Sequence, residues 1–276
     1  MTAFSASTSV SSKMGNILDG KVAIVTGASR GIGRGIALAY ADEGATVAVV
    51  SRGQEGVDKV VAEIEARGGK AIGIVCNVAD REAIIRTVAR TAELHGRIDI
   101  LVNNAQGCGS AESPAGSTVL RPLEELPEAE WDYNFVTGAT GSLRFMQAAF
   151  PYLKASGAGR VINFGSMWGQ LGYEGAAAYN ATKEAIRGLS RTAAREWGRH
   201  GITVNVINPV IYTDLMANYE KAAPEAVQAM IEQIPLRRVG DPLQDAGRVA
   251  VFIAGPDAQY LTGMTFQVDG GFYMAP

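Results

Sequence analysis

The chain has 276 residues, 47% of them hydrophobic and 19% charged, with 33 glycines and 10 prolines, so it can bury a large core and is not intrinsically disordered. Its 25 basic and 28 acidic residues give a net charge of −3, which argues against a nucleic-acid or anionic-membrane partner. Two cysteines and two histidines are too few for a Cys/His zinc site or a disulfide framework, so we expect no metal.

Residues 1–18 are rich in Ser and Thr and contain neither an apolar core nor an arginine. This composition predicts a flexible leader rather than a secretory signal or a transit peptide. No window approaches the ~18 consecutive apolar residues of a membrane span. Two cysteines without an export signal indicate reduced thiols and a cytoplasmic protein.

From residue 21 onward, short β-branched runs alternate with amphipathic stretches, which is typical of βαβ units around a parallel sheet. The predicted strands are mostly apolar, as strands covered on both faces should be: 22–26, 46–51, 71–78, 98–103, 160–164, 202–207 and 265–268. The predicted helices are 31–43, 53–67, 81–95, 128–155, 177–198 and 242–254. The expected fold is α/β: one doubly wound Rossmann-type domain over residues 19–276, with a seven-stranded parallel sheet flanked by helices.

Two segments interrupt this alternation. Residues 107–121 form a Gly/Ser/Pro-containing loop after the fourth strand, and residues 211–235 form a helical insertion with Met and Tyr after the sixth. Ligands tend to bind at the carboxyl ends of the strands in such sheets, so we expect a substrate lid at about 211–235.

The first strand leads into Thr-Gly-Ala-Ser-Arg-Gly-Ile-Gly, residues 26–33, and then into a helix. Glycines let backbone N–H groups and a helix N-terminus approach the pyrophosphate of a dinucleotide. The candidate phosphate-binding residues are Gly27, Ser29, Arg30, Gly31, Ile32 and Gly33. A tight turn that uses glycine only for steric reasons is the alternative.

The second strand ends without the acidic residue that would bind a ribose 2′-hydroxyl in an NAD site. Ser51 and Arg52 stand there instead, and with Arg30 they offer a hydroxyl and two cations to a 2′-phosphate. These residues predict NADP(H) over NAD(H) as the cofactor. The alternative is that both arginines are simply solvated.

Tyr179 and Lys183 share one face of a predicted helix, because they are four residues apart. An ammonium beside a phenol favours the phenolate, and an oxidised nicotinamide nearby would add to this, which brings the pKa of the tyrosine toward working pH. Such a tyrosine can serve as general acid and base. Ser166 follows the fifth predicted strand and could hydrogen-bond the same substrate oxygen, although an ordinary loop serine is the alternative.

Together with Asn103-Asn104-Ala105 and the Val-Asp-Gly-Gly of residues 268–271, the order of these motifs resembles the classical short-chain dehydrogenase/reductase family over about residues 19–276. The resemblance implies that Tyr179 exchanges a proton with the substrate oxygen, that Lys183 holds the nicotinamide ribose and that Ser166 positions the carbonyl. It also implies hydride transfer between nicotinamide C4 and a carbonyl or carbinol carbon. Further cofactor contacts are expected at Asn77, Val78, Asn103, Ala105, Pro209 and Thr213.

Family members are commonly dimers or tetramers, so a homo-oligomer is expected, with residues 262–276 resembling the part that packs between subunits. Four departures from the family pattern stand out. The family's fourth catalytic residue, an Asn that holds a relay water, falls on Gly138; Gln106 replaces a glycine, Asn77 replaces an acidic residue, and Val210 follows Pro209 where the family has Gly. The departure at Gly138 puts turnover in doubt more than cofactor binding.

Aromatic and Met residues follow Ser166 and occur in the insertion, and those expected to line the substrate site are Trp168, Tyr173, Tyr212 and Met216. Packing in the core or between subunits is the alternative for these residues. No cluster of Arg or Lys accompanies them, which favours a bulky, mostly uncharged ketone or secondary alcohol. Cys108, a lone thiol with no His partner, is predicted to be a bystander.

The leading hypothesis is an NADP(H)-dependent carbonyl reductase or alcohol dehydrogenase. A second hypothesis is the 3-oxoacyl thioester reductase of fatty-acid synthesis, which should carry a basic surface for an acidic carrier protein. A third is a dinucleotide-binding protein with impaired catalysis.

Overall fold

Seven strands form one parallel sheet in the order β3-β2-β1-β4-β7-β8-β9. The computed structural model describes residues 16–274, and the first fifteen residues of the predicted leader lie outside them. The strands are β1 (Val22–Thr26), β2 (Thr46–Ser51), β3 (Lys70–Val75), β4 (Ile100–Asn103), β7 (Arg160–Phe164), β8 (Thr203–Pro209) and β9 (Thr265–Val268). This confirms the predicted α/β class and the seven-stranded parallel sheet.

Four of the predicted strands have the observed bounds, and the other three differ at one or both ends by one to three residues. The third strand ends at Val75 rather than at residue 78, and the prediction that both of its faces are covered is wrong. Lys70, Gly73 and Val75 are exposed, because β3 is an edge strand and has a neighbour on one side only.

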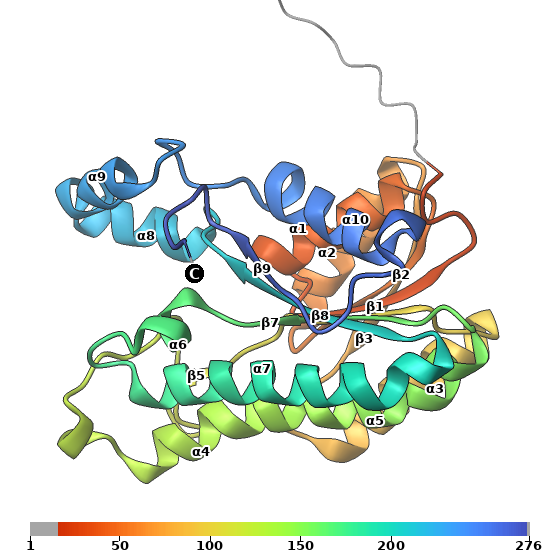
Figure 1. Cartoon of the computed structure of the whole chain (residues 1–276), viewed down its shortest axis with the longest axis horizontal. Coiled ribbons are helices and arrows are strands. Elements are labelled where there is room, and N and C mark those ends of the chain that lie inside the picture. Colours follow the sequence, from red (N-terminus) through yellow and green to blue (C-terminus); the bar gives the residue numbers. More distant parts are fainter. Residues whose placement is uncertain (1–15, 275–276) are drawn as a thin grey trace, which may run out of the picture.

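Helices cover both faces of the sheet (Figure 1). One layer contains α1 (Gly31–Asp42), α2 (Gln54–Ala66) and α10 (Arg248–Ala254), and the other contains α3 (Arg81–His95), α5 (Ala139–Ala155) and α7 (Ala177–Trp197). Successive strand residues point to opposite faces, so Val25 packs into the first core and Ile24 into the second. The strands are therefore apolar along their length rather than alternating.

Two predicted helices are each divided. The predicted helix 128–155 is two helices, α4 (Glu128–Thr137) and α5, because the backbone of Gly138 (φ −93°, ψ −90°) leaves the helical region. The predicted helix 242–254 begins as a π-helical segment, Pro242–Gly247, and continues as α10.

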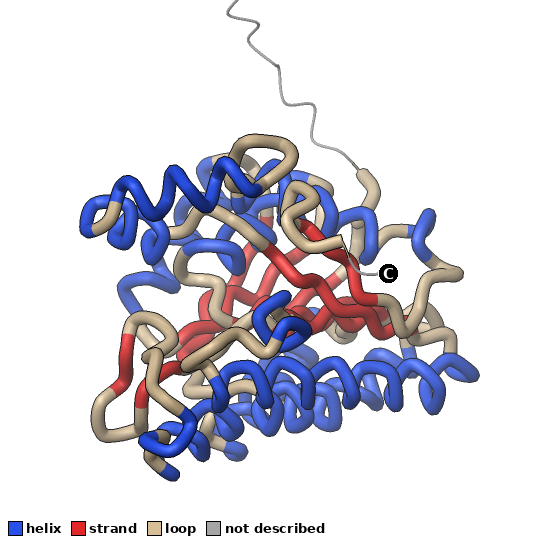
Figure 2. Tube along the Cα trace, turned by 60° about the vertical axis from the view of Figure 1, so that its left-hand side comes forward, coloured by secondary structure: helices blue, strands red, loops and turns tan. Residues whose placement is uncertain are grey.

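The segments that interrupt the βα alternation gather at one end of the sheet (Figures 1 and 2). The loop after β4 contains a small antiparallel hairpin, β5 (Cys108–Gly109) and β6 (Pro114–Ala115), and β7 is followed by α6 (Met167–Leu171). The predicted lid contains α8 (Asp214–Ala222) and α9 (Pro224–Gln233). The carboxyl ends of the strands are thus the face on which a ligand can be enclosed.

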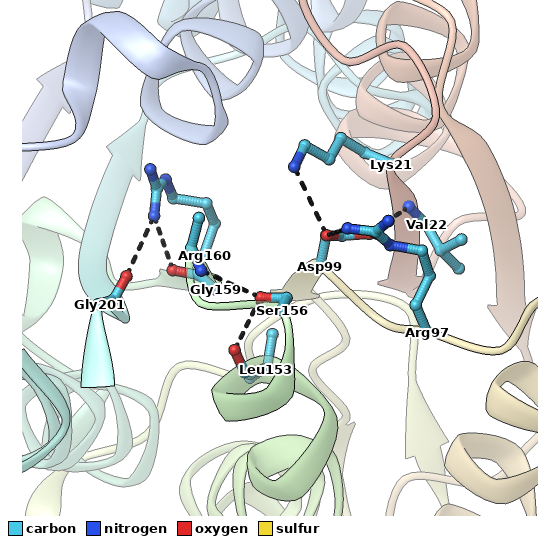
Figure 3. Close-up of polar contacts among 10 residues, drawn as sticks. Lys21, Val22, Arg97, Asp99, Leu153, Ser156, Gly159, Arg160 and Gly201 are labelled. Carbon is cyan, nitrogen blue, oxygen red and sulfur yellow. Dashed lines mark hydrogen bonds and ion pairs between the residues drawn. The ribbon is translucent and has the colours of Figure 1, made fainter.

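The opposite end of the sheet is held by polar contacts (Figure 3). The buried carboxylate of Asp99 accepts a hydrogen bond from the Val22 N–H at 3.0 Å and pairs with Arg97 and Lys21. Nearby, the buried Arg160 guanidinium donates to the carbonyls of Gly159 and Gly201. These contacts fix the amino-terminal ends of β1, β4 and β7.

The domain begins earlier than the predicted boundary at residues 18 and 19. Leu18 is buried in the core, and its N–H donates to the carbonyl of Glu43 at 3.0 Å, while the Ile17 N–H donates to the Glu43 carboxylate. The sequence did not predict this earlier start of the domain, because two apolar residues after a Ser/Thr-rich stretch form no periodic pattern. In the part of the chain that the structure describes, none of the helices is both long and apolar enough to cross a membrane.

Candidate active site

A cavity of about 420 Å³ opens at the carboxyl ends of β1, β2 and β4. It lies where the strand order reverses, the usual place for a ligand in a doubly wound sheet. The cavity gathers most of the predicted cofactor residues: Gly27, Ser29, Arg30, Gly31, Ile32, Ser51, Arg52, Asn77, Val78, Ala105 and Thr213. It is also lined by residues that the sequence did not single out for this role, among them Cys76, Asn104, Gln106, Tyr133 and Thr137.

The loop between β1 and α1 has the backbone geometry of a phosphate cradle. Gly27 and Gly31 have left-handed φ angles of 66° and 53°, and a Cβ on Gly33 would lie 2.4 Å from the Gly27 carbonyl oxygen. Among residues 16–274, no side chain caps the N-terminus of α1, so its first N–H groups remain available to an anion. These features fit the pyrophosphate of a dinucleotide.

Asn104 rather than Asn103 supports this loop. The Asn104 amide donates to the carbonyls of Thr26 and Gly27, and its own N–H donates to the Thr26 hydroxyl at 3.0 Å. The Asn103 side chain points into the core instead, where it donates to Asn163 at 2.8 Å. The structure therefore does not bring the predicted Asn103 side chain to the cavity, since the side chains of successive strand residues alternate.

Four further predicted cofactor residues do not line the cavity: Gly33, Pro209, Tyr179 and Lys183. Gly33 lies beneath the turn, where it allows close approach of the loop and the helix, and Pro209 is the last residue of β8, paired with Val268.

The end of the cavity at β2 is polar and positively charged. Arg30 and Arg52 are exposed there, and the hydroxyls of Ser29 and Ser51 are 2.9 Å apart. The Arg52 guanidinium donates to the hydroxyl of the buried Tyr133 at 3.0 Å. Tyr133 comes from α4, and no sequence pattern links it to Arg52, which is 81 residues earlier.

Ser166, Tyr179 and Lys183 meet beyond the end of β7, the neighbour of β4. The Lys183 ammonium is buried, donates to the carbonyl of Phe164 at 3.0 Å, and lies 5.3 Å from the centre of the Tyr179 ring. The Ser166 hydroxyl accepts from the Trp168 N–H at 3.2 Å, which starts α6. One strand end and one turn of α7 thus bring the three predicted catalytic side chains together.

Burial governs the proton affinities of this group. It raises the pKa of the Tyr179 phenol to about 12, against a hydrogen bond with Ser166 that lowers it. Burial also lowers the pKa of the Lys183 ammonium to about 8. The sequence predicted that the neighbouring lysine lowers the pKa of Tyr179. In the chain without a bound cofactor, burial raises this pKa by more, because desolvation disfavours the charged forms of both side chains.

The departures at Gly138 and Gln106 occupy the same place. A Cβ on Gly138 would lie 2.4 Å from Gln106 Oε1, 2.4 Å from Thr182 Cγ2 and 2.9 Å from the Asn134 carbonyl oxygen. The Gln106 side chain therefore fills the space that a side chain at 138 would need, and the two departures compensate for each other sterically.

The predicted substrate residues divide into two groups. Trp168 and Tyr173 stack with ring centres 4.2 Å apart, and Trp168 meets Tyr179 edge to face at 6.1 Å, so an aromatic wall adjoins the candidate acid. Tyr212 is exposed and donates to Glu220 within the lid, and Met216 is half-buried on α8. Trp168 contacts Tyr179 of the candidate catalytic group, and Tyr173 adjoins that group through its stacking on Trp168.

Cys108 lies close enough to Lys183 for the ammonium to lower the pKa of the thiol, but burial raises this pKa more. A protonated thiol is a poor nucleophile, in keeping with the predicted bystander. No group of three or more His, Cys, Asp or Glu side chains within residues 16–274 could hold a metal ion.

Comparison with known proteins identifies the class. The profile of the family described as enoyl-(acyl carrier protein) reductase matches residues 27–273. A 12alpha-hydroxysteroid dehydrogenase from Clostridium sp. is 36% identical over 267 residues, which cover 94% of this chain and 99% of that protein. The 3-oxoacyl-[acyl-carrier-protein] reductase FabG of Staphylococcus aureus is 40% identical over 255 residues, with 92% and 98% covered.

Among solved structures, one described as a short-chain alcohol dehydrogenase from Sinorhizobium meliloti 1021 superimposes with a TM-score of 0.83 at 38% identity, covering 92% of this chain and 97% of the other. The chain thus belongs to the classical short-chain dehydrogenase/reductase family. It is an oxidoreductase of the kind that uses a nicotinamide dinucleotide, which the residues around its cavity fit.

Removing the buried charge of Lys183 should stabilise the fold. The folded-state pKa of Lys183, about 8, lies below its ordinary 10.5, so the cost of burying the ammonium is fully present below pH 8 and vanishes as the pH rises through 10.5. We expect Lys183→Met to raise the free energy of unfolding by roughly 2 kcal/mol at pH 7. This figure is the relieved cost of burying the ammonium minus the contribution of the lost hydrogen bond to the Phe164 carbonyl. Urea unfolding of both proteins at pH 7 and pH 10 should show this gap closing at the higher pH. A difference in unfolding free energy that is constant or grows with pH would contradict a buried Lys183 ammonium with a lowered pKa.

Restoring the family's Asn at position 138 should not improve the protein. Gly138→Asn forces its Cβ against Gln106 Oε1 and Thr182 Cγ2, which should lower the free energy of unfolding by about 1–3 kcal/mol. In a Gln106→Ala background the cost should be smaller, because the clash with Gln106 Oε1 is gone while those with Thr182 Cγ2 and the Asn134 carbonyl oxygen remain. Equal costs in both backgrounds, measured by urea unfolding, would show that the two residues do not compete for this space.

Proposed function

We propose that the chain is an NADP(H)-dependent oxidoreductase that interconverts a bulky, mostly uncharged ketone and its secondary alcohol. The observation that carries the proposal is the meeting of Ser166, Tyr179 and Lys183 at the end of β7, beside a wall of Trp168 and Tyr173. A proton donor, a cation and an apolar surface then surround one substrate carbonyl.

The preference for NADP(H) is supported by the end of the cavity at β2. Arg52 and Arg30 supply cations, Ser29 and Ser51 supply hydroxyls, and Tyr133 orients the Arg52 guanidinium. A guanidinium and two hydroxyls suit the dianionic 2′-phosphate of NADP(H).

The chain's own residues supply the proton chemistry. When bound, the nicotinamide dinucleotide supplies or accepts the hydride. In the direction of reduction, Tyr179 donates its phenolic proton to the substrate oxygen, and Ser166 holds that oxygen by a hydrogen bond. Lys183 stabilises the resulting phenolate, because its ammonium lies 5.3 Å from the ring centre. The high pKa of the buried phenol keeps this proton in place until substrate arrives.

A bulky substrate is favoured by the aromatic wall and by one relative, since the Clostridium protein carries the name of a hydroxysteroid dehydrogenase. The alternative, a 3-oxoacyl thioester reductase, is favoured by the FabG relatives. The charge of the lid disfavours this alternative, because an excess of carboxylates would repel an acidic carrier protein. Helices α8 and α9 carry four carboxylates, Asp214, Glu220, Glu225 and Glu232, and one lysine, Lys221. The third hypothesis, a dinucleotide-binding protein with impaired catalysis, is disfavoured by the assembled trio.

We further propose that the protein is a cytoplasmic homo-oligomer, a dimer or a tetramer. The homo-oligomer is supported by the edge of β9, which pairs on one side only within the described residues, and by apolar side chains exposed around the terminal segment: Tyr260, Met264 and Met274. An unpaired strand edge flanked by exposed apolar side chains suits a second copy of the chain.

One assay separates the three functions. NADPH absorbance is followed with a panel of bulky ketones, a small diketone and an acetoacetyl thioester, and Tyr179→Phe is the control. We expect turnover of bulky ketones that falls at least 100-fold in the variant, because the general acid is lost. Turnover of the thioester alone would establish the second function, and tight NADPH binding without turnover the third. Undiminished turnover in Tyr179→Phe would remove Tyr179 from the reaction.

The cofactor preference is tested by Arg52→Asp. Losing a cation and gaining a carboxylate at the end of β2 should raise the KM for NADPH by at least 10-fold and lower that for NADH. Arg86→Asp on α3 makes the same change of charge on an exposed side chain outside the cavity and should change neither constant. A wild-type protein with the lower KM for NADH would contradict the preference.

A further inference from the structure

The aromatic wall beside Tyr179 is attached to a helix that is too short to be stable alone. α6 contains only the five residues Met167–Leu171, whereas an isolated helix in water needs about 12 or more. Its first turn is capped by Ser166, whose hydroxyl accepts from the Trp168 N–H. The position of α6 must therefore depend on contacts between its residues and the rest of the fold.

On the side of the sheet, α6 is held through the carboxamide of Gln170. Gln170 Oε1 accepts from Asn208 Nδ2 of β8 at 2.5 Å and from Gln267 Nε2 of β9 at 2.6 Å. The two donors lie 38 and 97 residues after Gln170, so no local sequence pattern links the three amides. One oxygen thus joins the short helix to two neighbouring strands of the sheet.

Gly165 makes room for this amide cluster of Gln170, Asn208 and Gln267. A Cβ on Gly165 would lie 2.3 Å from Asn208 Oδ1. Gly165 stands between Phe164, which accepts the hydrogen bond of the Lys183 ammonium, and Ser166. The amide cluster therefore adjoins the strand end that carries the candidate catalytic serine.

The amide cluster is costly to bury. Asn208 Oδ1 and Gln267 Oε1 are buried and have no hydrogen-bond partner within residues 16–274. Unpartnered buried acceptors destabilise a folded chain, and apolar side chains would fill the same space without this cost. The amides are therefore explained better by the position that they impose on α6 than by a contribution to stability.

On its other side, α6 packs closely against α7. A Cβ on Gly169 would lie 3.1 Å from the Asn180 carbonyl oxygen and 3.3 Å from Lys183 Cβ. The Asn180 amide also donates to the carbonyl of Tyr173 at 2.8 Å. α6 and the residues that follow it are thus fixed to the helix that carries the candidate acid.

We propose that Gln170 is a positioning residue that makes the site selective for ring-bearing ketones: its carboxamide fixes α6 and, with it, the aromatic wall beside Tyr179. This inference rests on the proposed function of the site. The two rings of the wall, Trp168 and Tyr173, are within 6° of parallel, and 44% of Tyr173 is exposed, which suits contact with a flat apolar ring. A wall that is already ordered binds a rigid substrate without the entropic cost of ordering side chains, whereas a small ketone gains little from it.

The test compares wild type with Gln170→Leu, which removes the acceptor, and Gln170→Glu, which keeps one. We expect Gln170→Leu to lower kcat/KM for bulky cyclic ketones about 10- to 100-fold and that for a small diketone less than about 3-fold, with the KM for NADPH unchanged. Gln170→Glu should stay within about 3-fold of wild type, because its carboxylate accepts from both donors. Gln147→Leu makes the same change as Gln170→Leu on an exposed side chain of α5 and should alter neither value.

Equal losses for the bulky and the small ketone in Gln170→Leu would overturn the proposal, and so would a Gln170→Glu variant as impaired as Gln170→Leu. A double variant tests the connection to the sheet. Because Gln267 acts through Gln170, the combination of Gln170→Leu with Gln267→Leu should be no worse than Gln170→Leu alone. Additive losses would overturn the connection.

Hydrogen exchange provides a readout independent of activity. The backbone N–H groups of residues 167–173 should exchange at least about 10-fold faster in Gln170→Leu than in wild type, while those of α1 keep their rates in both. Unchanged exchange at residues 167–173 would overturn the proposal. A wild-type chain without ketone turnover would refute the proposed function, and hydrogen exchange would still decide whether Gln170 fixes α6.

Discussion

The hydrogen bond from the Lys183 ammonium to the carbonyl of Phe164 joins the helix that carries the candidate acid to the centre of the sheet. Tyr179 lies one turn before Lys183, and Ser166 lies two residues after Phe164, so this contact sets the spacing of all three side chains. Its burial is costly, since desolvation lowers the pKa of the ammonium to about 8. The rest of the fold must offset this cost, as is common where a protein holds a charged group ready for chemistry.

A polar chain links this catalytic half to the dinucleotide half. Asn103 at the end of β4 donates to Asn163 in β7, and Asn163 donates to Ser190 in α7, each at 2.8 Å. β4 also leads into Asn104, which supports the phosphate loop through Thr26 and Gly27. The distance between the phosphate cradle and the catalytic helix is therefore fixed by buried hydrogen bonds across two strands and one helix. The Asn103 side chain contributes to the site through these hydrogen bonds.

Features that depend on local spacing were predictable from the sequence. The apolar runs of β1 and β2, the glycines of the phosphate loop and the i, i+4 relation of Tyr179 and Lys183 each need only a short window of residues. Features that depend on tertiary packing were not. The helical pattern is continuous across Gly138, so the sequence does not predict the break there. The steric relation of Gly138 to Gln106, which is 32 positions earlier, appears only in the folded chain. Tyr133 reaches Arg52 across 81 positions, and Leu18 gains its burial from the end of α1.

We propose that the chain holds the Tyr179 phenol neutral by burial and that the positive charge of an oxidised nicotinamide, with Lys183, makes it ionisable. The most direct measurement is a pH titration of the chain labelled with ¹³C at the tyrosine ring carbon Cζ, with Tyr179→Phe identifying the resonance. The chain alone should show Tyr179 titrating near pH 12, and addition of NADP⁺ should lower this pKa by about 1–3 units. A Tyr179 resonance that titrates at the same pH with and without NADP⁺ would contradict the account.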